Sequence, residues 1–328
     1  MIRLFRVEVR RLLARRLLRV LGAVLIAGLA FAAVNTALHS SRDLAAARVK
    51  AEQQSKQYAA QSAENVKMCE ADQAAGRIPA EVMCASEGTE GLPTAENFYA
   101  DPRYNFARSA PDSVAGAIVV VGMLGVVLGA SAIGAEWSAG TFAGLLTWEP
   151  RRLRVLAAKL LALAALVVAI ATVAVAVQLL VYWAIAGTRG TLAGTTSHVV
   201  RDLIGRGARG VGVVGLLSVA AASTAGILRS TAGALGAAAG YLVAFEILGR
   251  NLRPGWARWL LSSNAGAVVD GRVAIYPPQR FSGSSSFGPP VEVKPFILHG
   301  SRAAIVLSLA TAALVALWAL LLRRRDVT

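Results

Sequence analysis

The charged and polar side chains best suited to chemistry are concentrated in residues 134–159, which read GAEWSAGTFAGLLTWEPRRLRVLAAK and lie between two long apolar segments. Glu136 follows directly on an apolar run. We expect it to mark the point where a membrane helix leaves the hydrocarbon, because a carboxylate is tolerated there. Spacings of four, four and three residues predict one helical stripe, able to lie on a membrane surface or a partner, made of Trp137, Thr141, Leu145 and Trp148.

A break in the helix is expected at Glu149, because Pro150 disfavours a helical conformation in the preceding residue and suits the first turn of a new helix. Arg151, Arg152 and Arg154 then fall in that first turn, where the helix dipole disfavours each of them by about 0.3–1 kcal/mol. We expect compensation from anionic lipid headgroups, from Glu149 or from an acidic partner. A cytoplasmic anchor that obeys the positive-inside rule is the alternative.

This arrangement resembles the cytoplasmic coupling segment of ABC-2 type transporter permeases. In that family a Glu ends the second membrane helix and a Gly-Thr pair follows four residues later. After a short helix, a Pro and one or more Arg precede a Lys inside the third helix. Extended variants like GAEWSAGT, which includes Trp137, look typical of permeases from high-GC bacteria. The resemblance implies contact with an ATPase through the positions that match here: Glu136, Gly140, Thr141, Pro150, Arg151, Arg152, Arg154 and Lys159.

Composition indicates a polytopic membrane protein. The chain has 328 residues, of which 55% are apolar and only 16% are charged. A membrane-spanning helix needs about 20 mostly apolar residues. Six stretches qualify, and we predict an all-α integral membrane protein with a single transmembrane domain built on residues 18–38, 114–135, 156–187, 208–228, 231–249 and 302–322. The third stretch is longer than a bilayer requires, so we expect it to tilt or protrude.

Residues 1–17 predict a basic amphipathic helix in the cytoplasm, with arginines interspersed among apolar side chains. A secretory signal peptide would have a shorter apolar core and a small-residue cleavage site, so we expect a retained interfacial helix that continues into the first span. In the resembled family this is the elbow helix, which also meets the ATPase. An anchor that binds lipid headgroups is the alternative, and both roles are compatible.

Residues 39–112 form the only long hydrophilic segment, with more acidic than basic side chains. Residues 41–67 contain no Gly or Pro and are rich in Ala, Glu, Gln and Lys, which predicts a helical extracytoplasmic insert. Cys69 and Cys84 are the two cysteines of the chain. In an oxidising space they would close a ring that stabilises the fold by about 3 kcal/mol. Two free thiols are the alternative.

Polar side chains inside the predicted spans are few. Glu246, near the outer end of the fifth span, is the one acidic residue there, and we expect it to pair with Arg250 rather than to contact substrate or relay protons. Gln178 in the third span is a weaker candidate. Two glycine pairs with GxxxG spacing indicate ordinary helix packing, or else a sliding surface or the seam of a dimer: Gly125 with Gly129, and Gly236 with Gly240.

Residues 250–301 are predicted to be external. Trp256 and Trp259 suit the membrane interface, and a Gly/Ser/Pro-rich loop follows them. In the resembled family the region before the last span holds re-entrant helices that cap the exit, and RPGWARWLLSSNAGAVVDG looks like that element.

Motifs of catalysis are missing from the sequence. It has no GxxxxGK[ST] phosphate loop, so ATP must be bound by a separate subunit. It has no GxSxG or HExxH motif and no Cys/His cluster, and we expect no catalytic residue, no cofactor and no metal site in this chain. The net charge of +15 is carried largely by arginines that flank the apolar stretches, which favours anionic membrane lipids over nucleic acid as partners.

The resemblance therefore predicts the permease subunit of an ABC-2 type exporter in the plasma membrane. Two permease chains, identical or different, would work with two cytoplasmic ATPase subunits. The excess of Lys and Arg in the predicted inner segments places both termini in the cytoplasm. A receptor or scaffold that acts through residues 39–112 is the main alternative. An enzyme acting on lipid is a weaker one, because the spans contain too few polar residues to build its site.

Overall fold

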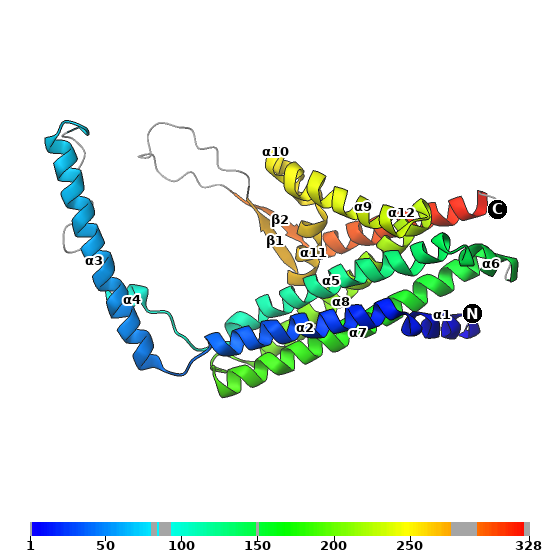
Figure 1. Ribbon diagram of the computed structural model, residues 1–328, viewed down its shortest axis with the longest axis horizontal. Coiled ribbons are helices and arrows are strands. Elements are labelled where there is room, and N and C mark those ends of the chain that lie inside the picture. Colours follow the sequence, from blue (N-terminus) through cyan, green and yellow to red (C-terminus); the bar gives the residue numbers. More distant parts are fainter. Residues whose placement is uncertain (1, 80–83, 85–92, 149–150, 277–293, 325–328) are drawn as a thin grey trace. The chain divides into compact units, whose positions relative to one another are not determined.

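The computed structural model of the protein describes residues 2–79, 84, 93–148, 151–276 and 294–324, most of them helical (Figure 1). The chain divides into two compact units. One comprises Met1–Ala33, Ala107–Tyr182 and Gly194–Thr328, and the other Val34–Phe106 and Trp183–Ala193. We call them the span unit and the insert unit.

Six helical segments of the described chain are long and apolar enough to cross a membrane, which agrees with the predicted number of spans. They are α2 (Arg16–His39), α5 (Phe106–Ser138), α7 (Arg152–Thr188), α8 (Ser197–Leu228), a composite segment (Thr231–Leu252) and α12 (Gly300–Arg324). The composite segment contains α9 (Thr231–Tyr241), a π-helix η1 (Leu242–Gly249) and α10 (Arg250–Leu252). α8 begins well before its apolar stretch, because the Thr196 side chain caps it by accepting a hydrogen bond from the Val199 N–H, 3.4 Å away.

Small residues set the closest helix contacts of the span unit. Gly125 and Gly129 of α5 both lie against Ser218 of α8, and a Cβ atom at Gly129 would stand 3.1 Å from the Ser218 carbonyl carbon. This GxxxG pair therefore serves close packing within the chain. The second pair differs, because a Cβ at Gly236 or Gly240 would meet no atom within 4 Å.

Short elements connect the composite segment to the last span. A 3-10 helix η2 (Pro254–Trp259) and α11 (Leu261–Asp270) lead into β1 (Arg272–Ile275), which pairs antiparallel with β2 (Phe296–His299) in the register Arg272↔His299. Ala267, Leu298 and Ala303 form a buried cluster where α11, β2 and α12 meet. The described chain is mostly helical, in agreement with the predicted all-α class, but the two-stranded sheet was not predicted.

The insert unit is built on the long helix α3 (Leu44–Ala74), as the composition of residues 41–67 predicted. Asp43 caps it by accepting a hydrogen bond from the Ala46 N–H, 2.9 Å away. Near its other end a disulfide joins Cys69 to Cys84. The short helix α4 (Ala95–Phe98) packs beside α3, with the rings of Tyr58 and Phe98 5.7 Å apart.

Removal of this disulfide should loosen the insert unit. The bond closes a loop with a sequence separation of 15 residues, so a C69S/C84S variant should lose about 3 kcal/mol of local stability. Limited proteolysis should then cut residues 69–84 much faster than in the wild type. An M68S variant, with one exposed side chain changed next to the bond, is the control. Equal cleavage of all three proteins would contradict the role of the bond.

Candidate coupling site

The second span ends in a sharp break rather than in a continuous helix. α5 ends at Ser138, Gly140 takes a left-handed conformation with φ of +69°, and α6 (Thr141–Trp148) begins at the next residue. Such a φ favours glycine because a Cβ atom would be strained there. The Thr141 Oγ1 donates a hydrogen bond to the Glu136 carbonyl, 3.3 Å away. The predicted single stripe is therefore wrong, since Trp137 and Thr141 lie on different helices.

Glu136 and Lys159 meet in a buried cluster of charged side chains. The Lys159 ammonium donates to Glu136 Oε2 at 2.6 Å and to both carboxylate oxygens of Glu8 at 3.0 Å. The side chains of Lys159, Glu8 and Glu136 are only 2%, 7% and 9% exposed. Three helices, α1 (Ile2–Ala14), α5 and α7, thus supply one ion network.

Arg15, between α1 and α2, completes this network. Its guanidinium donates to Glu136 Oε1 at 2.9 Å and to the carbonyl oxygens of Ser131 and Ala132 at 3.0 Å. The exposed Arg11 also approaches this network, with its Nη1 3.5 Å from Glu8 Oε1, so that each buried charge has a partner. We call Glu8, Arg15, Glu136 and Lys159 the charge cluster. A pocket of about 390 Å³ lies beside it, lined by Arg11, Ala14, Arg15, Ala135, Glu136 and Thr141.

Aromatic side chains fix α6 to its neighbours. Phe142 is fully buried, with its ring centroid 4.6 Å from that of Trp137 and 6.3 Å from that of Trp318. The Lys159 ammonium lies 5.9 Å from the Phe142 ring, and the Arg229 guanidinium lies 4.6 Å from the Trp137 ring. Both distances are within the range of cation–π attraction. Phe142 therefore joins the short helix to α5, α7 and α12.

The three arginines predicted to belong to a coupling segment have different environments. Arg152 donates to the Leu322 carbonyl at 2.7 Å, in the last turn of α12. The unsatisfied carbonyls of that turn carry partial negative charge, so they compensate a cation at the start of α7. This partner was not among those predicted. Arg151 and Arg154 are exposed. Glu149 and Pro150 lie outside the described residues, as does the side chain of Trp148.

Sequence reasoning missed four residues of this site: Glu8, Arg15, Phe142 and Trp318. Glu8 left a usable signal, because it is the one acidic residue in the first 42 positions and it interrupts a strongly basic helix. A lone acid in such a helix indicates a partner elsewhere in the fold. Phe142 and Trp318 left none, since apolar side chains beside a span are ordinary.

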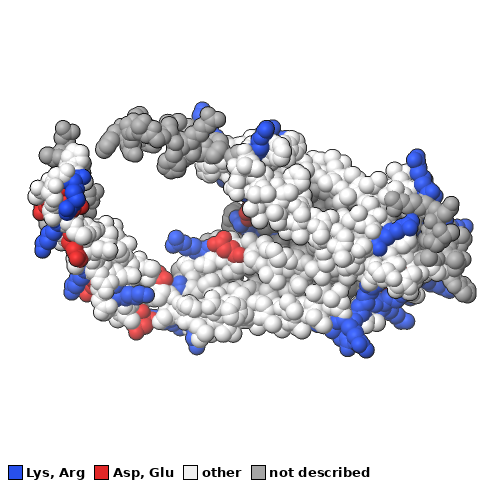
Figure 2. Space-filling view, turned by 45° about the horizontal axis from the view of Figure 1, so that its top comes forward, with Lys and Arg blue, Asp and Glu red and all other residues white. Residues whose placement is uncertain are grey.

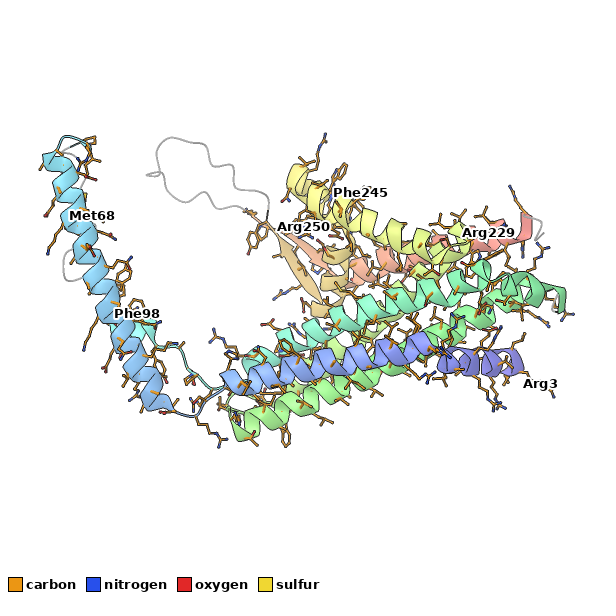
Figure 3. All side chains as sticks on the ribbon, viewed as in Figure 1. Arg3, Met68, Phe98, Arg229, Phe245 and Arg250 are labelled. Atoms are coloured by element: carbon orange, nitrogen blue, oxygen red, sulfur yellow. A yellow bond between two sulfur atoms is a disulfide. The ribbon has the colours of Figure 1, made fainter. Side chains whose placement is uncertain are left out.

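The two polar residues predicted to lie within the spans, Glu246 and Gln178, lie apart from the charge cluster in sequence. Glu246 pairs with Arg250 at 3.4 Å, as predicted, and also accepts hydrogen bonds from the Ser262 Oγ–H at 2.6 Å and the Ser262 N–H at 2.8 Å. It therefore ties the π-helix to the start of α11. Gln178 is buried in α7, with 4% of its surface exposed. Arg229 and Arg250 mark opposite ends of the composite segment (Figure 3).

Comparison with known families gives one match. A family model described as ABC-2 family transporter protein covers residues 2–327. Curated proteins and solved structures give no match. Because the family model spans nearly the whole chain, including every residue of the charge cluster and both ends of the coupling segment, the chain belongs to the ABC-2 transporter family and is a membrane permease component.

Proposed function

We propose that this chain is the permease subunit of an ABC-2 exporter in the plasma membrane. Two permease chains would work with two cytoplasmic ATPase subunits, which bind and hydrolyse ATP. The observation that carries the proposal is the attachment of α6. This short helix, at the position of the family's coupling segment, is joined through Phe142 and the charge cluster to α1, α5 and α7.

The surface around α6 suits an acidic partner in the cytoplasm. Arg151 and Arg154 are exposed just after α6, and Arg3, Arg6 and Arg10 are exposed on α1. Figure 2 shows basic side chains gathered at the end of the span unit that carries α1 and α6. Negative groups on an ATPase surface, and lipid headgroups around α1, would both be attracted there.

Force applied to α6 would reach several spans together. Phe142 packs against Trp137 of α5 and Trp318 of α12, and Arg152 of α7 donates a hydrogen bond to the last turn of α12. Packed interfaces of this kind shift between discrete arrangements rather than deform gradually. We propose that ATP-driven closure of the ATPases moves α6 as a rigid element, and that α1, α5, α7 and α12 follow to open an outward path.

Charge reversal at the exposed arginines tests the ATPase contact. An R151E/R154E variant should lose most of the ATPase that copurifies with tagged wild-type protein in mild detergent, because attraction becomes repulsion at a shared surface. Arg152 is left intact because it binds α12. The measurement is the ratio of ATPase to permease, with vanadate-sensitive ATP hydrolysis of the recovered complex.

An R201E/R272E variant is the matched control for this experiment. Both side chains are exposed, and neither belongs to α1, α6 or the start of α7. Its ATPase ratio should equal that of the wild type. If both variants lose the ATPase equally, the total positive charge of the protein, rather than Arg151 and Arg154, determines ATPase binding. If neither loses it, the proposed contact is wrong.

A receptor or scaffold role is the second candidate, favoured by the insert unit. α3 is polar and mostly exposed, with Ala51 as its one buried residue. A long helix of this kind gains little from packing within its own unit, and it offers a large surface to a partner. Deletion of residues 44–98 should leave ATPase copurification intact if the transporter proposal holds. The receptor role would be favoured by a different pair of results. The wild type would copurify with an extracytoplasmic partner but with no ATPase, and the deletion variant would lose that partner.

A further inference from the structure

A second basic region lies away from the coupling site, where the composite segment ends and α12 begins. Arg250 marks this end of the span unit in Figure 3, whereas Arg3 and Arg229 mark the other end. Here η2 carries Arg258 and Trp259, and the first turn of α12 carries Arg302. Both guanidinium carbons lie 5.7 Å from the centre of the Trp259 ring. Two positively charged guanidinium groups therefore contact the same indole ring.

These arginines have no acidic partner in the part of the chain that the structure describes. The carboxylates of the neighbouring elements are already paired, Glu246 with Arg250 and Asp270 with Arg206. Arg302 also stands in the first turn of a helix, where the dipole opposes a cation. A guanidinium that contacts an aromatic face keeps its N–H groups free for an anion. The site thus carries an uncompensated charge of +2 and open donors.

Exposed apolar side chains lie within six positions of Arg258 in the sequence. Leu252, Trp256 and Trp259 are exposed by 77%, 47% and 56%. Trp side chains with this exposure beside a span are typical of the interface between hydrocarbon and headgroups. A phosphate flanked by glycerol and the first part of an acyl chain matches this combination of charge and apolar surface. A free anion would leave the apolar surface unused.

We propose that Arg258, Trp259 and Arg302 form a binding site for the phosphate of an anionic glycerophospholipid. The two guanidinium groups donate to the phosphate oxygens, and Leu252 and Trp256 contact the upper acyl region. The site is distinct from the ATPase contact and does not depend on transport. It would hold the start of α12 and the 3-10 helix together at the membrane surface.

Lipid retention measured by native mass spectrometry tests this site. Wild-type protein, purified in detergent, is titrated with phosphatidylglycerol or with phosphatidylcholine. We expect the wild type to retain phosphatidylglycerol more tightly than phosphatidylcholine. In R258Q/R302Q the affinity for the first bound phosphatidylglycerol molecule should be roughly 30-fold weaker, since two well-placed arginines are removed. R201Q/R272Q removes the same charge from two other exposed positions and should retain the wild-type affinity.

Further arms separate the possible causes. R258K/R302K keeps both charges but loses the planar donor fork, so it should bind with intermediate affinity. Circular dichroism in phosphatidylcholine micelles should show the same helix content in all variants. Inorganic phosphate at millimolar concentration should not displace the lipid. The proposal is overturned if the wild type does not distinguish the two lipids, if both glutamine variants lose affinity equally, or if phosphate competes fully.

Discussion

Replacing Lys159 with methionine should lower the free energy of unfolding by about 3–5 kcal/mol, because it removes the one fully buried cation beside the carboxylates of Glu8 and Glu136. Only the more exposed Arg11, 3.5 Å from Glu8, and Arg15, 2.9 Å from Glu136, would then face them. Unfolding in mixed micelles, driven by SDS and followed by helical circular dichroism, measures this change. A K56M variant removes an exposed lysine from α3 and should stay within about 0.5 kcal/mol of the wild type.

A second substitution should rescue much of that loss. In K159M/E8Q the charge of Glu8 is removed as well, which leaves Glu136 paired with Arg15 at 2.9 Å. The double variant should therefore be more stable than K159M alone, and the coupling energy between positions 8 and 159 should fall within about 0.5–3 kcal/mol. Additive effects of the two substitutions would show that Glu8 and Lys159 do not interact as ions.

Truncating Phe142 to alanine should have a comparable effect on stability, about 3–5 kcal/mol, because its fully buried ring fills the space between Trp137, Trp318 and Lys159. F142L keeps most of the volume and should cost less than about 1.5 kcal/mol. F31A is the control, since Phe31 is 76% exposed. The same unfolding assay compares the three variants.

The functional effect of F142A distinguishes the attachment of α6 to the spans from the binding of the ATPase. Arg151 and Arg154 remain, so the ATPase should still copurify, whereas stimulation of ATP hydrolysis by the permease should be lost. A variant that loses the ATPase altogether would show that α6 itself, rather than its anchor, forms the contact. Unchanged stimulation would mean that Phe142 does not transmit movement.

The helical architecture could be read from the sequence because membrane spans are defined by local composition. Each span is a continuous apolar stretch, and such a stretch satisfies its backbone hydrogen bonds within one helix. A helix was likewise predicted in residues 41–67 from their lack of Gly and Pro, and α3 covers Leu44–Ala74. The strands β1 and β2 were missed, because four residues each, separated by a long Gly/Ser-rich stretch, carry too little periodicity.

The candidate coupling site was proposed from the sequence, but the geometry of its side chains could not be predicted. The motif pointed to Glu136 and Lys159, yet their contact and the third member, Glu8, depend on tertiary packing over sequence separations of 23 and 151 residues. The helix break at Gly140 could have been predicted, since a glycine commonly ends one helix and a following Thr commonly starts another. The partner of Arg152 was not, because a backbone carbonyl has no sequence signature.

The charge cluster also dictates the order in which the protein can assemble. Glu8 is made well before its buried partner Lys159, which lies 151 positions later. At about 5–20 residues per second, the ribosome needs roughly 8–30 s to cover that distance. Throughout this interval α1 lacks the Lys159 partner for its Glu8 carboxylate. Its docking then marks the moment at which the first three spans have come together.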